Sequence, residues 1–138
     1  MEKAKSYALK LLSKRDYFEP ELRSKLLLKG FTEEEIQKTI EYLKDQKLLD
    51  DRKLLERYKE INLQKGKSPQ SIKNKLYRKG ITDVEFSFEE ELKSALHLLN
   101  FKYKKEKNYA DIVKFLKNRG FSYSVIQEAV NKFLDGEE

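Results

Sequence analysis

The chain has 138 residues, of which 38% are hydrophobic and 39% are charged, and its 30 Lys and Arg against 24 Asp and Glu give a formal charge of +6. This composition is poorer in apolar and richer in charged residues than an average domain, which favours amphipathic helices and excludes α/β folds with thick buried sheets. Cysteine is absent, which excludes a disulfide framework, a thiolate metal site and a cysteine nucleophile.

Apolar residues recur at intervals of three and four along most of the chain, as in amphipathic helices. Ala4, Tyr7 and Ala8 show this spacing in the first segment, and Pro20 and Pro69 mark helix starts, where proline is tolerated. We therefore predict helices over residues 2–14, 19–29, 33–47, 51–65, 69–79, 83–87, 88–106, 109–119 and 123–135. Whether 83–107 forms one bent helix or two stays open.

A short pattern occurs three times, at Gly30, Gly80 and Gly120, and predicts equivalent junctions between successive helices. In each copy a Leu lies four residues before the glycine, a basic residue precedes it, and Phe or Ile follows. Glycine suits the left-handed residue just beyond a helix, and the apolar residue after it can pack back on the Leu. The next residue is Thr or Ser, a natural N-cap. Two copies predict capping boxes, Thr32 with Glu35 and Thr82 with Glu85.

The three junctions predict an all-α protein of three tandem three-helix repeats in an elongated, curved array. We place the repeats at 1–50, 51–87 and 88–138. The glycines lie 50 and then 40 residues apart, which indicates a shortened third helix in the second repeat. No repeat can bury its apolar face alone, so stacking on the next repeat is expected to stabilise the array.

The second repeat carries the basic excess: residues 61–82 contain no acidic residue. A solvated helix face is the usual role of such lysines, but this segment is also a candidate surface for a polyanion or an acidic protein groove. We predict contacts with such a partner for the six basic residues of this segment, Lys65, Lys67, Lys73, Lys75, Arg78 and Lys79. Candidates for additional basic contacts are Arg23, Lys25, Lys102, Lys104 and Lys105.

The N-terminal half contains a series of short motifs, which are Tyr7-Ala8-Leu9, Leu11-Leu12-Ser13, Arg15-Asp16-Tyr17, Glu21-Leu22, Lys25-Leu26 and Lys29-Gly30-Phe31. Together they resemble the opening signature of the RecX family of recombination regulators. Further along, Leu49-Asp50-Asp51-Arg52, Lys65-Gly66, Ile72, Leu76 and Lys79-Gly80-Ile81 are similar to the family's junction and central helix. The chain departs from the family at Leu54-Leu55, where Phe-Ala is common, and in the shortened helix of repeat two.

The resemblance implies a non-enzymatic protein that lies in the groove of a RecA-DNA filament, inhibits strand exchange and ATP hydrolysis, and favours filament disassembly. Its implied partners are RecA and, more weakly, single- or double-stranded DNA. The alternative is a direct DNA-binding module, because helix, glycine turn and helix resemble a helix-turn-helix. The helices after Thr32 and Thr82 begin with acidic residues, however, which phosphates would repel.

No residues assemble into an expected catalytic, cofactor or metal site. Asp50 and Asp51 are more simply helix caps than a metal-binding pair, and His97 is the only histidine, expected at the surface or its boundary. The segment MEKAKSYALK lacks the apolar stretch of a signal peptide, and Leu26–Leu28 is far too short to cross a bilayer. We expect a cytoplasmic monomer without a membrane association.

Overall fold

The computed structural model describes residues 2–136, and that part of the chain is entirely helical apart from turns and irregular segments. The helices are α1 (Glu2–Lys14), α2 (Glu19–Lys29), α3 (Glu33–Asp45), α4 (Asp51–Gln64), α5 (Pro69–Arg78), α6 (Phe88–Phe101), α7 (Tyr109–Asn118) and α8 (Tyr123–Leu134). The predicted all-α class is confirmed. The first residue of the first predicted repeat and the last two of the third, 137–138, lie outside the described residues.

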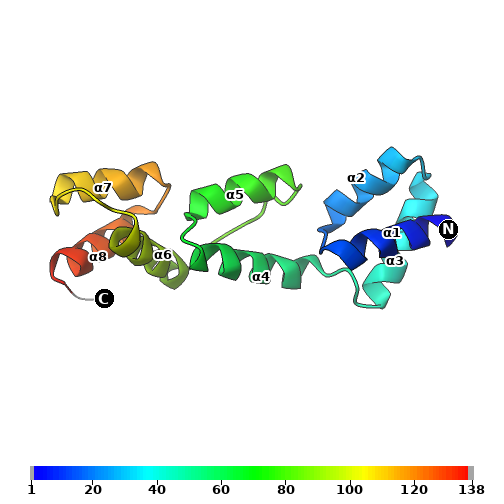
Figure 1. Ribbon diagram of the computed structural model, residues 1–138, viewed down its shortest axis with the longest axis horizontal. Helices are drawn as coiled ribbons and strands as arrows, with labels where there is room; N and C mark the ends of the chain where they lie inside the picture. Colours follow the sequence, from blue (N-terminus) through cyan, green and yellow to red (C-terminus); the bar gives the residue numbers. More distant parts are fainter. Residues whose placement is uncertain (1, 137–138) are drawn as a thin grey trace. The chain divides into compact units, whose positions relative to one another are not determined.

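The chain forms two compact units, and the division falls within α4 and α5. Unit 1 comprises residues 1–58 with 77–81. In it α1, α2 and α3 pack together (Figure 1) around one hydrophobic core. The helical spacing seen in the sequence supplies this core, which consists of Ala8, Tyr17, Leu22, Leu26, Ile36, Ile40, Leu43 and Leu49.

Unit 2 comprises residues 59–76 with 82–138. There α6, α7 and α8 pack on one another. Their shared core includes Ala95, Leu99, Ile112, Leu116, Val125, Ile126, Ala129 and Val130. Both α1–α3 and α6–α8 are therefore three-helix groups, and each has its own buried core, whereas the sequence analysis expected no repeat to bury its apolar face alone.

Glycines in the left-handed conformation lie at the ends of several helices. Gly30 has φ 103° and Gly120 has φ 82°. At both positions, the N–H groups of the glycine and of the next residue donate to carbonyls in the last turn of the helix. The Gly30 N–H donates to the Leu27 carbonyl at 3.0 Å, and the Phe31 N–H donates to the Leu26 carbonyl at 3.2 Å. This is the Schellman arrangement expected of such an end. Gly66, which was not among the predicted junctions, ends α4 in the same way, with φ 80°.

The prediction of a helix over residues 83–87 was wrong. Residues 81–87 contain no helix, so the third helix of the second repeat is absent rather than shortened. The predicted box at Thr82 does not form. Instead the Ser87 hydroxyl accepts the Glu90 N–H at 3.1 Å and Glu90 accepts the Ser87 N–H at 2.8 Å. The helix therefore begins at Phe88, because Ser87 and Glu90 satisfy the unpaired donors of its first turn.

The end of α6 also differs from the prediction, which extended the helix to residue 106. Tyr103 is buried, its N–H donates to the Leu98 carbonyl at 3.1 Å, and its hydroxyl donates to the Glu106 carbonyl at 2.6 Å. These bonds turn the chain out of the helix after Phe101. The range 83–107 thus holds a single helix, and an exposed segment runs from Lys104 to the Asn108 cap of α7.

Candidate functional site

The start of α2 is capped by two carboxylates. Its N-cap residue, Phe18, has no side-chain oxygen, and Glu21 accepts the Phe18 N–H at 2.9 Å instead. The Asp51 carboxylate, 32 residues after Glu19 in the sequence, accepts the Glu19 N–H at 2.7 Å. Burial raises the pKa of Asp51, and the hydrogen bond from Glu19 only partly offsets that effect. Asp50 caps α4 itself by accepting the Lys53 N–H at 3.2 Å.

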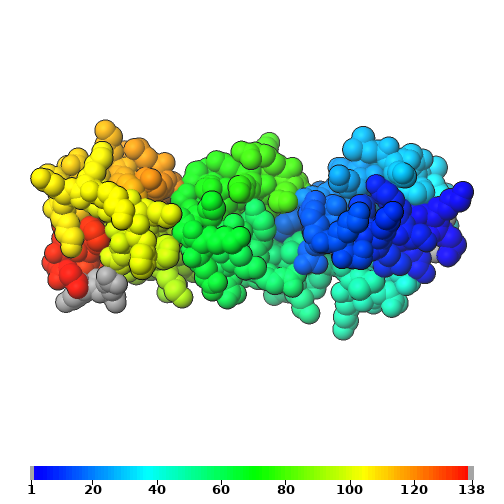
Figure 2. Space-filling view, in the orientation of Figure 1, coloured from blue at the N-terminus to red at the C-terminus, as the bar shows by residue number. Residues whose placement is uncertain are grey.

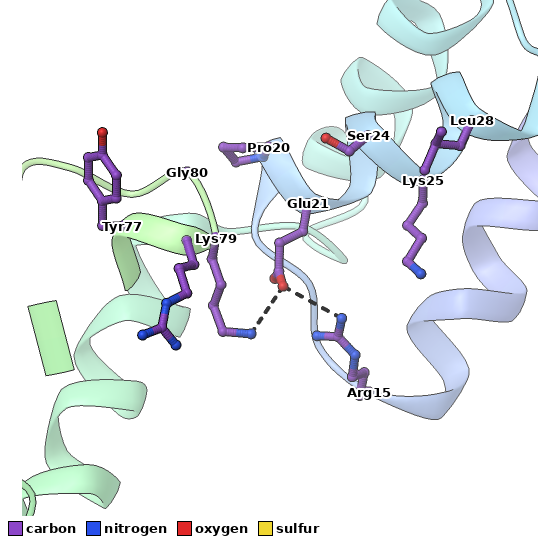
Figure 3. Close-up of a pocket in the computed structure, with 10 residues that line it drawn as sticks. Arg15, Pro20, Glu21, Ser24, Lys25, Leu28, Tyr77, Lys79 and Gly80 are labelled. Carbon is purple, nitrogen blue, oxygen red and sulfur yellow. Dashed lines mark hydrogen bonds and ion pairs between the residues drawn. The ribbon is translucent and has the colours of Figure 1, made fainter. Parts of the chain in front are cut away.

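The second carboxylate oxygen of Glu21 forms ion pairs with two cationic side chains. Lys79 Nζ lies 3.1 Å away and a guanidinium nitrogen of Arg15 lies 3.5 Å away, and both side chains point toward Glu21 in Figure 3. Only 13% of the Glu21 side chain is exposed. Burial acts to raise the pKa of Glu21, but the Phe18 N–H and the charges of Lys79 and Arg15 outweigh it and lower the pKa below its ordinary value.

A pocket of about 360 Å³ opens beside this group, entirely within unit 1. We call it the Glu21 pocket. It is lined by Arg15, Pro20, Glu21, Ser24, Lys25, Leu28, Tyr77, Arg78, Lys79 and Gly80 (Figure 3). Four of these side chains are cationic and one is anionic. Two large apolar side chains at the pocket are exposed, Leu28 at 86% and Tyr77 at 69%. The pocket therefore combines an excess of positive charge with apolar surface.

Gly80 permits a close approach at this pocket. Its φ is 87°, and a Cβ added to it would lie 2.6 Å from Pro20 Cβ, far inside ordinary carbon contact. Lys79, the residue before it, reaches Glu21. The glycine thus holds the end of α5 against the first turn of α2 within this unit.

The predicted basic residues divide into paired and unpaired groups. Lys79 is bound to Glu21, and Arg23 is bound to Glu19 at 2.9 Å and to Gln37. These two cations are therefore largely neutralised by their neighbours. Lys25 and Arg78 line the pocket and are exposed. Among residues 2–136, no carboxylate lies within ion-pair distance of Lys25 or Arg78.

The remaining candidates belong to unit 2, where all are exposed. They are Lys65, Lys67, Lys73, Lys75, Lys102, Lys104 and Lys105. Lys73 Nζ lies 5.9 Å from the Phe86 ring centroid, a weak cation–π contact. The structure brings the turn at Lys65 and Lys67 close to Lys102, which lies at the end of α6.

Sequence reasoning missed Lys59, which is buried. Its ammonium donates to the Glu85 carbonyl at 2.8 Å, lies 3.5 Å from a Glu90 oxygen, and sits over the Phe86 ring at 5.0 Å. Lys59 therefore holds the segment that replaces the predicted helix over 83–87. The available signal was its place four residues after Leu55, on the inner face of α4.

Within residues 2–136, no cluster of three or more Asp, Glu and His side chains is placed to hold a metal ion. Across the same residues, the helices are too short or too polar to traverse a bilayer.

Comparison with known proteins assigns the chain to a family. Residues 4–43 match the model of the first three-helix domain of RecX. The chain is 32% identical to "Regulatory protein RecX" of Vibrio vulnificus (strain CMCP6), over 95% of this chain and 93% of that protein. It is also 32% identical to the protein of that name from Clostridioides difficile (strain 630), over 99% of this chain and 70% of the relative.

The fold agrees with this similarity over nearly the whole length. The crystal structure of RecX from Lactobacillus salivarius superimposes with a TM-score of 0.77 at 24% identity, covering 95% of this chain and 94% of that one. The family model reaches only the first three helices, whereas the relatives and the crystal structure also cover the segment without a third helix and the α6–α8 group. From its sequence and its fold together, the chain belongs to the RecX family.

Proposed function

We propose that this protein binds the RecA filament on DNA and inhibits the recombinase and ATPase activities of RecA. The observation that carries the proposal is the full-length similarity to proteins called "Regulatory protein RecX", with 32% identity over 95% of this chain. The RecX family regulates RecA, so RecA is the partner that family membership supports. Such a partner would place the protein in the cytoplasm, where we propose that it acts as a monomer.

The Glu21 pocket is our candidate for one RecA contact. Lys25 and Arg78 supply charge without a nearby carboxylate, and Leu28 and Tyr77 supply exposed apolar area. Interfaces commonly place aromatic and Arg side chains at their energetic centre. We propose that Lys75, on α5 before Arg78, and the basic residues of unit 2 contribute contacts to the filament or its DNA. We also propose that the repeats divide at 50–51 and 87–88.

Duplex recognition by a helix-turn-helix has less support. In that role α3 would enter a DNA groove, but its first turn consists of Glu33, Glu34 and Glu35. Glu35 is further engaged in the capping box with Thr32, at 2.9 and 3.1 Å. Phosphates would be repelled by these carboxylates.

Co-sedimentation with RecA filaments formed on single-stranded DNA tests the proposal. The wild-type protein should pellet with the filament, and Lys25→Glu combined with Arg78→Glu should bind at least tenfold more weakly. The control, Lys3→Glu with Lys10→Glu, changes the same total charge on exposed positions of α1 outside the pocket. Lys79 is not changed, because a carboxylate there would face Glu21 and disturb the fold.

Each outcome of this experiment is decisive. Failure of the wild-type protein to pellet with RecA filaments would refute the proposed function. Equal weakening by the pocket variant and the α1 control would remove the Glu21 pocket from the interface and leave a general charge effect.

A further inference from the structure

Two segments far apart in the sequence meet on the surface of unit 2. The turn between α4 and α5 contains Gly66, and a Cβ at Gly66 would lie 3.2 Å from His97 Nε2 and 3.7 Å from Lys102 Cε. The Ser94 hydroxyl also lies 3.5 Å from the Lys67 carbonyl oxygen. The α4–α5 turn therefore rests against the second half of α6, and Figure 1 shows these two segments side by side.

An exposed aromatic side chain lies at this meeting point. Phe101 is 63% exposed, and the centroid of its ring lies 4.8 Å from that of the His97 ring, with the planes inclined at 41°. His97 and Phe101 are four residues apart and so share one face of α6. Phe101 is not part of the hydrophobic core of unit 2. Its ring therefore offers an aromatic face to a ligand, held in place by the half-buried His97.

Both segments carry exposed lysines. Lys65 and Lys67 come from the α4–α5 turn, and Lys102, Lys104 and Lys105 follow α6. All five are exposed, and Figure 2 shows the yellow segment after α6 on the surface. Within residues 2–136, no carboxylate lies within 4.0 Å of any of their ammonium groups. Glu106 is the only acidic residue in 102–107, so the segments carry a local excess of positive charge.

We propose that this surface, formed by Phe101, His97 and the five lysines, binds single-stranded nucleic acid. A base would stack on the Phe101 ring while the lysines contact the flanking phosphates, the combination used by single-strand binding sites. In a duplex the faces of internal bases are covered by their neighbours, so an exposed ring of this kind favours unpaired strands. This site extends the proposed function, in which DNA is present with RecA, but it requires no contact with RecA.

The absence of tryptophan from the chain permits a direct test. Phe101→Trp introduces a single indole, whose emission should be quenched in a saturable way by oligothymidylate. Tyr123→Trp is the matched control, because Tyr123 is 77% exposed and starts α8. The neighbouring Ser122 N–H is bonded to Glu91, which lies ten residues before Phe101 on α6, about 15 Å along its axis.

The expected result is quenching of Phe101→Trp without quenching of Tyr123→Trp. Raising the salt concentration should move the midpoint to higher oligonucleotide concentration, because the phosphate contacts release counterions. No quenching at position 101, or equal quenching at both positions, would overturn the proposal.

Two further variants separate stacking from charge. Phe101→Leu should weaken binding of oligothymidylate about fivefold or more, with an unchanged salt dependence. Lys65→Glu with Lys67→Glu should weaken it at least tenfold and reduce the salt dependence. Oligouridylate should bind similarly, and tighter binding of duplex DNA than of either single strand would contradict the proposal.

The RecA assay distinguishes this site from the proposed function. Phe101→Leu should still inhibit RecA, because the stacking site is not the RecA contact. If the variant lost inhibition while its affinity for oligothymidylate was unchanged, Phe101 would be a protein contact and the nucleic-acid site would be wrong. If wild-type protein bound oligothymidylate but not RecA, only the proposed function would fail.

Discussion

Replacing the junction glycines by alanine tests two separate reasons for glycine at these positions. One is the left-handed backbone conformation, and the other is the lack of space for a Cβ atom. Gly30 and Gly80 have φ values of 103° and 87°, so each holds a left-handed conformation. An L side chain in that conformation costs about 1–2 kcal/mol. A Cβ at Gly30 meets nothing within 4 Å, so Gly30→Ala should lower the free energy of unfolding by this amount alone.

Gly80→Ala should be more destabilising, because a second cost is added. The new Cβ would lie 2.6 Å from Pro20 Cβ and 3.2 Å from Pro20 Cγ, whereas carbon atoms pack best at about 3.5–4.0 Å. The proline ring is attached to the α2 backbone and cannot rotate away. Overpacking of this kind costs roughly 1–3 kcal/mol. The total for Gly80→Ala is therefore about 2–5 kcal/mol.

Urea unfolding, followed by far-ultraviolet circular dichroism, measures the free energy of unfolding of both variants. The dependence of this free energy on urea concentration should be the same in both, which shows that the same transition is compared. Gly120→Ala repeats the test in unit 2, since its Cβ would lie 2.7 Å from Gln70 Cβ. Equal losses for Gly30→Ala and Gly80→Ala would refute the close approach. A larger loss for Gly30→Ala would refute the assignment of Gly30 to open space.

Further predictions concern the caps, the buried carboxylate and the buried lysine. Ser87→Ala should cost about 1 kcal/mol of unfolding free energy and Thr82→Ala less than about 0.5, as chemical denaturation can measure, because only Ser87 caps a helix. Because the pKa of Glu21 is lowered in the folded protein, its charged form stabilises the fold at pH values above the ordinary pKa of glutamate. This stabilisation disappears as the pH falls through the lowered pKa. In thermal unfolding at a series of pH values, Glu21→Gln should therefore lose less stability than the wild type as the pH falls. Lys59→Met keeps the aliphatic packing but leaves the Glu85 carbonyl without this donor, so it should cost about 1–3 kcal/mol and speed amide exchange in 82–87; unchanged exchange would contradict the role given to Lys59.

Much of the fold could be predicted because its determinants are local. The three-four spacing placed the helices, and the glycine pattern placed Gly30 and Gly120 one residue or two beyond helix ends. The family resemblance, read mainly from residues 7–31, is confirmed. These signals lie within one or two helical turns of the residues they position, so a single sequence contains them.

The errors in the predicted caps arose where contacts between residues far apart in the sequence determine the structure. Thr82 and Glu85 have the spacing of a capping box, but Glu85 offers its carbonyl to Lys59, 26 residues away, and Ser87 starts the helix instead. Asp51 was predicted to be a helix cap, but the sequence could not show that its carboxylate caps α2, 32 residues away, rather than the helix at whose start it lies. Local propensity cannot reveal either partner.

The candidate contacts show the same limit. Sequence reasoning predicted contacts for Lys79 and Arg23 and did not foresee that they would pair with Glu21 and Glu19. It did not foresee that the turn containing Lys65 and Lys67 would lie beside His97 and Lys102, because only the approach of Gly66 to α6 brings them together. Charge along a chain indicates which residues are available, and tertiary structure decides which of them remain unpaired.

Titration of RecA ATPase on single-stranded DNA with this protein tests the central claim most directly. We predict that hydrolysis falls progressively as the wild-type protein is added, and that a greater amount of the Lys25→Glu, Arg78→Glu variant is needed for the same loss. An ATPase rate that stays constant up to equimolar folded protein would contradict the account.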